Sequence, residues 1–187
     1  MHDDLKQALE VLRNGGVILY PTDTIWGIGC DATNAEAVER IYKLKQRLNT
    51  KGMLVLLDNT AKLGGYVNDI PEVAYDMAEL TTKPLTIIYD DAKNLPSNLL
   101  GEDGSIGIRI TEEKFSNQLC ARFKKPIVST SANISGESSP LNFGEVSDVI
   151  KTGVDYIVNF RQEEINNPQP SSIIKLTKDG QVKIIRE

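Results

Sequence analysis

Residues 17–31 read Val17-Ile18-Leu19-Tyr20-Pro21-Thr22-Asp23-Thr24-Ile25-Trp26-Gly27-Ile28-Gly29-Cys30-Asp31. The apolar residues 17–20 predict a buried strand that ends at Pro21. Small polar side chains follow the strand, together with glycines that allow a ligand to approach the backbone closely. Such residues at the end of a strand in an α/β protein are typical of a binding site. They are equally typical of a polar turn beside a packed tryptophan, and local chemistry leaves both interpretations open.

Helical and strand patterns alternate on either side of this stretch. Apolar spacing predicts helices at residues 3–14, 34–44, 71–80, 112–123 and 142–151, the second of them capped by Asn34. Apolar runs predict strands at residues 53–57, 85–89, 106–110, 127–128 and 156–160, and a closing hairpin that pairs 173–176 with 182–185 across Asp179-Gly180. The alternation predicts an α/β fold with helices packed on a sheet. The hairpin indicates that this sheet is mixed rather than purely parallel.

The length and composition are those of one globular domain. The chain has 187 residues, and at roughly 150 residues per domain we predict a single domain spanning residues 1–187. No apolar run approaches the ~20 residues that a membrane span needs. The acidic start, Met1-His2-Asp3-Asp4, differs from a signal peptide. We therefore expect a soluble cytoplasmic protein with no membrane partner.

The scarce residue types exclude several classes of enzyme. His2 is the only histidine and lies at the start of the chain, where side chains are usually frayed. This excludes a Ser-His-Asp or Cys-His catalytic site and a metal site built from several histidines. Cys30 and Cys120 are too far apart in sequence for a zinc knuckle, and we expect two ordinary core residues rather than a disulfide. Hydroxyls, amides, charged side chains, backbone groups and a bound Mg²⁺ remain as the means of catalysis.

The charge distribution is uneven. Residues 40–51 contain five cations and no acid, in a chain whose net charge is −5. A basic cluster at a helix end is suited to binding phosphates. The alternative is a solvated helix face whose C-terminal cations are favourable. The five cations are Arg40, Lys43, Lys45, Arg47 and Lys51.

Three further features are candidates for ligand binding. Residues 129–136, Ser129-Thr130-Ser131-Ala132-Asn133-Ile134-Ser135-Gly136, follow a strand and suit either a nucleotide or amino-acid site or an ordinary hydroxyl-rich loop. Arg109 lies near the end of an apolar strand and needs an anion, which is either a substrate carboxylate or an internal Asp or Glu. Residues 166–170, Asn166-Asn167-Pro168-Gln169-Pro170, are the most loop-like stretch and form either a lid or a plain connection.

Several of these motifs occur together, in order, across essentially the whole chain. Residues 20–30 are followed by Lys45-Gln46-Arg47, by the strand Ser105–Arg109 and by Ser131-Ala132-Asn133. Near the end come Pro170-Ser171-Ser172-Ile173-Ile174 and Arg186. This combination resembles the YrdC family, the threonylcarbamoyl-AMP synthases. The paired signature of that family is Lys-x-Arg followed far downstream by Ser-x-Asn.

The resemblance implies both a fold and a reaction. The implied fold is a single twisted mixed-sheet α/β domain with flanking helices and a large concave central site. The implied reaction is a nucleotidyl transfer that joins L-threonine, bicarbonate and ATP into threonylcarbamoyl-AMP and releases pyrophosphate. That product serves N6-threonylcarbamoyladenosine formation in tRNA, so downstream tRNA threonylcarbamoyl transferase proteins are expected partners. Direct contact with tRNA or double-stranded RNA is a further expectation.

The resemblance also assigns site residues. The expected catalytic residues are Lys45 and Arg47. Mg²⁺ is expected to arrive with ATP, without a metal ligand from the protein. Positioning and charge neutralisation suffice for this chemistry, and no protein nucleophile is required. The expected contacts to ATP are Lys45, Arg47, Lys51, Ser105, Asn133 and Arg186, and those to threonine are Thr24, Arg109, Ser131 and Ser171, with Arg109 on the carboxylate.

The geometry of a helix constrains the basic signature. Positions 45 and 47 lie about 200° apart on a helix and cannot both face one ligand there. We therefore expect the helix to end near Leu44–Lys45, which lets both side chains turn inward. The chain departs from the family at Leu48, where proline is usual, at Lys51-Gly52, where many members have Asn-Pro, and at residues 82–86, where a Gly-Pro run is usual. These departures concern substrate affinity more than reaction type.

Two other functions compete with the synthase. A double-stranded-RNA-binding or translation-associated protein of the same fold would place the basic stretch on RNA phosphates. The net charge of −5 and the isoelectric point near 5.1 count against a broad RNA footprint. The second alternative is a paralogue without synthase activity. Such paralogues tend to lose the Lys-x-Arg and Ser-x-Asn pairs, both of which this chain retains.

Overall fold

The computed structural model describes residues 1–47, 53–165 and 170–187. The strands in these residues are β1 Ile18–Tyr20, β2 Gly27–Gly29, β3 Leu54–Leu57, β4 Leu85–Tyr89, β5 Ile106–Ile110, β6 Ile127–Ser131, β7 Tyr156–Ile157, β8 Ser172–Leu176 and β9 Val182–Arg186. They form one sheet in the order β7-β1-β2-β6-β3-β5-β4-β8-β9. Three neighbouring pairs are parallel, namely β1 with β7, β3 with β5 and β4 with β8, and the others are antiparallel. The predicted mixed sheet is therefore confirmed.

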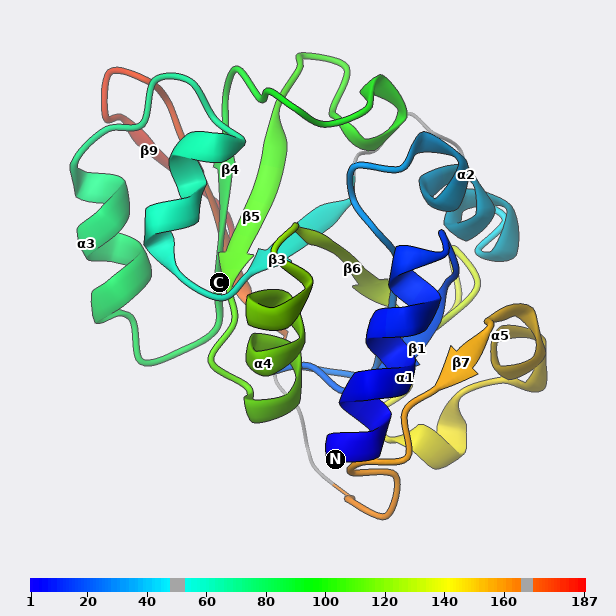
Figure 1. Cartoon of the computed structure of the whole chain (residues 1–187). Coiled ribbons are helices and arrows are strands. Elements are labelled where there is room, and N and C mark those ends of the chain that lie inside the picture. The colour runs from blue at the N-terminus through cyan, green and yellow to red at the C-terminus, as the bar shows by residue number, and fades with distance from the viewer. Residues whose placement is uncertain (48–52, 166–169) are drawn as a thin grey trace.

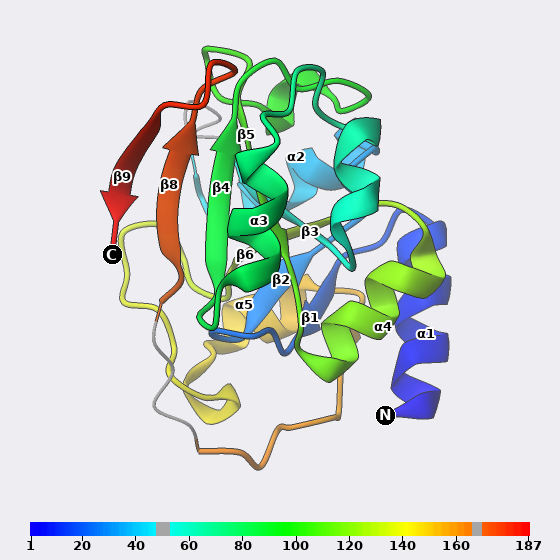
Figure 2. The same ribbon diagram turned by 90° about the vertical axis from the view of Figure 1, so that its left-hand side faces the viewer.

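The helices connect these strands. The α-helices are α1 His2–Arg13, α2 Ala35–Leu44, α3 Val73–Leu80, α4 Lys114–Phe123 and α5 Asp148–Gly153, and the 3₁₀ turns are η1 Thr60–Gly65, η2 Ser97–Leu99 and η3 Phe143–Glu145. In the predicted role of N-cap for α2, Asn34 accepts hydrogen bonds from the backbone N–H groups of Glu36 and Ala37. Figure 1 shows α1 and α4 side by side, and Figure 2 shows β4, β8 and β9 together at one edge of the sheet.

The two faces of the sheet bury different clusters. Side chains alternate along a strand, so Val55 and Leu57 of β3 join the cluster beneath α2, α3 and α5, whereas Leu56 joins the cluster beneath α1 and α4. Cys30 and Cys120 are both free thiols buried in these clusters, as expected. Helices α1 and α4 cover only the part of their face near β1, β3 and β6. The part over β4, β5 and β8 is left for the site described below.

The structure corrects one predicted helix. Residues 142–151 form η3 and α5 instead of one continuous helix. Asn142 caps η3 through its side chain, which accepts a hydrogen bond from Glu145 N, and the chain then extends at Val146. Val146 is buried in the core, so packing of this side chain overrides the local helical pattern. The remaining differences in length are small: α3 begins at Val73, and β7 ends at Ile157.

The sequence pattern did not predict β2. This strand contains a single apolar residue, Ile28, between two glycines. At Gly29 a Cβ atom would lie 2.6 Å from the carbonyl oxygen of Val128 and 2.7 Å from Cε1 of Tyr20. Glycine is thus required where neighbouring strands approach closely. Pairing with β2 also extends β6 to Ser131, beyond the predicted end at Val128.

We predict that Gly29→Ala lowers the free energy of unfolding by about 1–3 kcal/mol, because its methyl group meets backbone that cannot move aside. Gly64→Ala is the matched control, since nothing lies within 4 Å of a Cβ atom at that position. Urea denaturation of both variants provides the measurement. Equal unfolding midpoints for Gly29→Ala and the unsubstituted protein would contradict the close approach.

Candidate functional site

A central cavity of about 670 Å³ lies on the part of the sheet face that α1 and α4 leave uncovered. Strand alternation turns Thr86 and Ile88 of β4, and Gly107 and Arg109 of β5, toward this space. Gly107 has no side chain and so leaves the wall hollow between its neighbours. The volume is typical of small-molecule sites in proteins.

The polar lining of the cavity consists of hydroxyls and guanidinium groups. Among the described lining residues there is no Asp and no Glu, although the chain as a whole carries a net charge of −5. The arrangement is therefore suited to an anionic ligand. The charged lining residues are Arg47, Arg109 and Arg186, and the hydroxyl-bearing ones are Thr22, Thr24, Thr86, Ser105, Ser129, Thr130, Ser131, Ser139 and Ser171.

The basic signature leaves the helix as the sequence predicted. Helix α2 ends at Leu44, and Gln46 adopts a left-handed conformation with φ of +51°. Because the backbone reverses at Gln46, the side chains of Lys45 and Arg47 do not take the directions that a continued helix would give them. Arg47 then lines the central cavity. Lys45 is 2% exposed and also turns inward.

Lys45 stabilises the loop of residues 131–135 through hydrogen bonds to its backbone. Its Nζ donates hydrogen bonds to the carbonyl oxygens of Ser131 and, at 2.7 Å, of Asn133. Its own carbonyl oxygen accepts a hydrogen bond of 2.8 Å from Ser135 N. Burial, reinforced by the charge of Arg47, lowers the pKa of Lys45 to about 8. Lys45 is therefore a bridge between α2 and the loop, and the described residues do not place it in the cavity lining.

Asn133 also stabilises this loop. Its Nδ2 donates to the carbonyl oxygens of Ile134 and Glu137, both at 2.9 Å. Ser139, which does line the cavity, donates to Asn133 Oδ1 at 3.5 Å. The amide of Asn133 thus shapes the wall of the cavity and is not itself part of the described lining.

Arg109 has an internal partner. Its Nη1 donates to Asp23 Oδ1 at 2.8 Å and to Thr24 Oγ1 at 3.2 Å. The Arg109 side chain is 4% exposed and that of Asp23 is 12% exposed, so the pair is largely removed from water. Burial raises the pKa of the Asp23 carboxyl, and the charge of Arg109 opposes this rise.

This pairing answers the question that the sequence left open. The anion beside Arg109 is a carboxylate of the protein, that of Asp23. The guanidinium group is not saturated, however, because its Nε is buried without a hydrogen-bond partner. The guanidinium group therefore retains hydrogen-bonding capacity that Asp23 and Thr24 do not use.

Ser171 and Arg186 close the opposite wall. Arg186 donates to the carbonyl oxygen of Ser171 through Nε at 3.0 Å and through Nη2 at 2.8 Å. The hydroxyls of Ser171 and Thr86 lie 3.2 Å apart. These contacts join β9, β8 and β4 at the cavity, so the closing hairpin is part of the site.

Seven of the predicted site residues therefore share one cavity. Lys45 and Asn133 lie behind the wall, and Lys51 falls outside the described residues, as do Leu48 and residues 166–169 of the predicted lid or connection. The sequence analysis missed Thr86, whose signal was a single hydroxyl inside an apolar strand. The seven are Thr24, Arg47, Ser105, Arg109, Ser131, Ser171 and Arg186.

The basic stretch does not form one surface. Arg40 pairs with Asp155 at 2.9 Å, and the Lys43 side chain is 75% exposed, close to Glu39. Lys45 is buried, and Arg47 faces the cavity. The described cations of residues 40–47 thus point in different directions, which counts against a continuous basic face for RNA.

The described residues contain neither a cluster suited to a metal ion nor a helix suited to a membrane. No cluster of three or more His, Cys, Asp or Glu side chains in residues 1–47, 53–165 and 170–187 is arranged to hold a metal ion. In the same residues, no helix has the length and apolar character needed to cross a membrane.

Comparison with known proteins identifies relatives that match most of the chain. A model of the Sua5/YciO/YrdC family, described as "Telomere recombination", matches residues 10–187. The threonylcarbamoyl-AMP synthase of Pseudoalteromonas translucida is 38% identical over 169 residues, which is 89% of each chain.

Solved structures share the fold. E. coli YciO superimposes with a TM-score of 0.85 at 27% identity, covering 100% of this chain and 90% of YciO. P. abyssi Sua5 complexed with L-threonine gives 0.84 at 25% identity, covering 92% of this chain and 50% of Sua5, so this chain spans about half the length of that protein. The family match over residues 10–187 and these similarities show that the chain belongs to the Sua5/YciO/YrdC family.

Proposed function

We propose that this protein is a threonylcarbamoyl-AMP synthase, which joins L-threonine, bicarbonate and ATP and releases pyrophosphate. The observation that carries the proposal is the central cavity, where three guanidinium groups and a ring of hydroxyls meet without a lining carboxylate among the described residues. Relatives named for this activity support the same reaction.

The threonine subsite is proposed at Arg109. Arg109 lines the cavity, and its guanidinium group is the cation proposed to hold the substrate carboxylate. Thr24 lies beside it, with its hydroxyl 3.2 Å from Nη1 of Arg109. Ser131 and Ser171 line the same cavity and suit a short side chain that bears its own hydroxyl. The complex of P. abyssi Sua5 with L-threonine supports this choice of amino acid.

The ATP subsite is proposed between Arg47 and Arg186. Both guanidinium groups line the cavity, and charge-assisted hydrogen bonds from arginine to phosphate are strong and geometrically specific. Ser105 lines the cavity as well, and Asn133 shapes its wall. Since no carboxylate lines the cavity in the described part of the chain, the Mg²⁺ that accompanies ATP would be held mainly by phosphate oxygens. Bound in this way, it would neutralise charge that develops on the phosphates.

The chemistry asks the protein to position substrates and neutralise charge. The amine of threonine condenses with bicarbonate to a carbamate with loss of water, and an oxygen of the carbamate attacks the α-phosphorus of ATP while pyrophosphate leaves. Arg109 orients the amino acid, and Arg47 and Arg186 stabilise charge on the transferring and leaving phosphates. Lys45 keeps Ser131 and Asn133 in place and so acts here as a positioning residue.

The biological setting follows from the product. Threonylcarbamoyl-AMP is an activated intermediate, which tRNA threonylcarbamoyl transferase proteins would consume in modifying an adenosine of tRNA. We therefore expect the enzyme to act in the cytoplasm, where the transferase proteins would modify tRNA. Direct contact with tRNA or double-stranded RNA belongs to the same proposal, although the divergent directions of the cations in residues 40–47 favour transfer through partner proteins.

The first prediction concerns substrate dependence. Pyrophosphate release from ATP and Mg²⁺ should require both bicarbonate and L-threonine. Valine lacks the hydroxyl and should lower kcat/KM by at least about 100-fold, because it leaves polar groups of the site unpaired. A coupled pyrophosphate assay measures both effects. Equal release without an amino acid would overturn the synthase, and steeply salt-dependent RNA binding without turnover would favour the RNA-binding alternative.

The second prediction concerns Arg47. Arg47→Ala should weaken ATP binding about tenfold or more, through loss of a charge-assisted phosphate contact, and leave the melting temperature nearly unchanged. Lys43→Ala is the matched control, since Lys43 carries an equal charge, lies four residues before Arg47 and has an exposed side chain. ATP titrations by calorimetry compare the two variants. Equal losses in both, or an unfolded Arg47→Ala with normal ATP affinity in its folded fraction, would contradict the assignment.

The third prediction concerns the stability role of Arg109. Arg109→Met leaves Asp23 buried without its partner and should lower the free energy of unfolding by about 3–5 kcal/mol. Arg40→Met breaks a pair whose side chains are 46% and 42% exposed, and should cost about 0–1 kcal/mol. Urea denaturation without ligand compares them. Similar losses in the two variants would show that the Arg109–Asp23 pair contributes no more than a surface pair.

The fourth prediction separates the substrate role of Arg109 from that stability role. Arg109→Lys keeps the charge beside Asp23 and loses the planar fork of donors. Threonine affinity should therefore fall about tenfold, while ATP affinity and most of the stability remain. Threonine titrations of this variant provide the test, and an unchanged threonine affinity would place the carboxylate elsewhere in the cavity.

A further inference from the structure

A second cavity, of about 220 Å³, lies on the opposite face of the sheet from the central one. Alternation along β4 turns Leu85, Ile87 and Tyr89 toward it, while Thr86 and Ile88 face the central cavity. Helix α3 and the turn η1 contribute Ala78 and Leu63. The sheet thus separates two cavities, and the proposed synthase chemistry uses only one of them.

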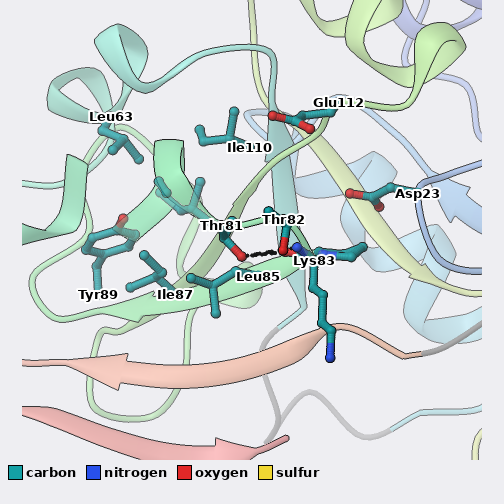
Figure 3. Close-up of a pocket in the computed structure, with 13 residues that line it drawn as sticks. Asp23, Leu63, Thr81, Thr82, Lys83, Leu85, Ile87, Tyr89, Ile110 and Glu112 are labelled. Atoms are coloured by element: carbon teal, nitrogen blue, oxygen red, sulfur yellow. Dashed lines mark hydrogen bonds between the residues drawn. The ribbon is translucent and has the colours of Figure 1, made fainter. Parts of the chain in front are cut away.

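One end of this second cavity is apolar. Leu63 is fully buried, Ile87 is 1% exposed and Tyr89 is 2% exposed. Figure 3 shows these three side chains on one side of the cavity, together with Leu85. An apolar lining of this kind binds the hydrocarbon part of a ligand.

The other end carries two carboxylates. Figure 3 shows Asp23 and Glu112 on the side away from Tyr89 and Leu63, and both line the cavity. Asp23 accepts a hydrogen bond from Arg109 through Oδ1 only, and Glu112 makes no hydrogen bond or ion pair with any described residue. Lys83 borders the same cavity, but its ammonium points away from both carboxylates. Among the described residues, Arg109 balances the charge of Asp23, and the neighbouring Arg161 is paired with Glu113 and Glu164, which leaves the charge of Glu112 without an ion-pair partner.

We propose that this second cavity binds a small organic ammonium ion, whose charged group lies between Asp23 and Glu112 and whose apolar body lies against Ile87 and Tyr89. A cavity with one apolar end and one acidic end matches such a ligand in both shape and charge. The volume fits a body of a few carbon atoms and excludes larger molecules.

The bound ammonium ion would also affect ligand binding in the central cavity, through Asp23. This residue lines the second cavity, and its partner Arg109 lines the central one. A substrate carboxylate on Arg109 would draw the guanidinium charge away from Asp23, and burial already raises the pKa of the Asp23 carboxyl. A cation on Asp23 would compensate for that loss. Binding of the ammonium ion and of threonine should therefore reinforce one another, a step that rests on the proposed function.

The binding test uses 3-methylbutylammonium chloride as the probe and 3-methylbutan-1-ol as its neutral counterpart. In calorimetric titrations of the full chain without substrates, the ammonium should bind at least about tenfold more tightly than the alcohol, because hydrogen bonds to charged groups are the stronger ones. Methylammonium lacks the apolar body and should bind more weakly than the probe. Equal affinity for the ammonium and the alcohol, or no binding of the ammonium, would overturn the proposal.

Three variants locate the site. Glu112→Gln removes an exposed carboxylate and should weaken ammonium binding about three- to tenfold. Glu102→Gln removes another exposed carboxylate, outside the cavity lining, and should leave it unchanged. Ala78→Leu fills the cavity from α3 and should abolish binding of the probe. Undiminished binding in both Glu112→Gln and Ala78→Leu would place the ligand elsewhere and overturn the assignment.

The coupling test measures threonine affinity with and without saturating 3-methylbutylammonium. Threonine should bind about three- to tenfold more tightly when the ammonium is present, and the ammonium should gain the same factor from threonine. An unchanged threonine affinity would overturn the coupling. A protein that binds the ammonium but never binds threonine would refute the proposed function and leave the second cavity as assigned, so the two failures are distinguishable.

Discussion

A buried guanidinium group has to be paired, and the arrangement of the site depends on this requirement. Arg109 is 4% exposed at the end of β5, and the loop between β1 and β2 brings Asp23 and Thr24 to it. An unpaired charge at this depth would cost several kcal/mol, so the loop is held against the strand. The same pair joins the two cavities, because each partner lines a different one. Stability, the proposed orientation of the substrate and the proposed coupling therefore depend on one contact.

The second requirement is a sheet whose two faces line different cavities. On β4 and β5 the residues toward α3 and α2 are apolar, whereas the central cavity receives Thr86, Gly107 and Arg109 together with the apolar Ile88. On β4, Ile87 lines the second cavity and its neighbour Ile88 lines the central one. On β5, Ile108 lines the second cavity and Arg109 the central one. Glycines at the cavity face leave room for ligands without weakening the opposite core. A single layer of backbone thus separates two cavities with different linings.

Much of the fold was predictable because long apolar runs and helix caps are local signals. The strands at 85–89 and 106–110, the cap at Asn34 and the end of α2 at Leu44 were all predicted correctly. The strand β2 was missed, because a glycine-rich segment becomes a strand only through its neighbours. The predicted helix at 142–151 was wrong, because burial of Val146 interrupts it.

The site was predictable as a set of residues more than as a set of contacts. Residue type and motif order predicted ten site residues, and seven of them line one cavity. Patterns along the chain could not reveal that Asp23 is the partner of Arg109, since 86 positions separate them. They also could not reveal that Lys45 faces the loop carbonyls rather than the cavity, because its direction depends on the reversal at Gln46. Long-range pairing decides these contacts, and local signals do not contain it.

The parallel pairing of early with late strands has a consequence for the order of folding. Strand β1 pairs with β7, and β4 pairs with β8, so neither half of the sheet is complete until segments far along the chain have joined it. Sheets dominated by such distant pairings form slowly compared with helical bundles. Ser171 and Arg186 lie in the last of these segments, so the central cavity gains its final wall when the hairpin of β8 and β9 docks. During synthesis on the ribosome, the emerging chain would then acquire much of its core before it acquires a complete binding site.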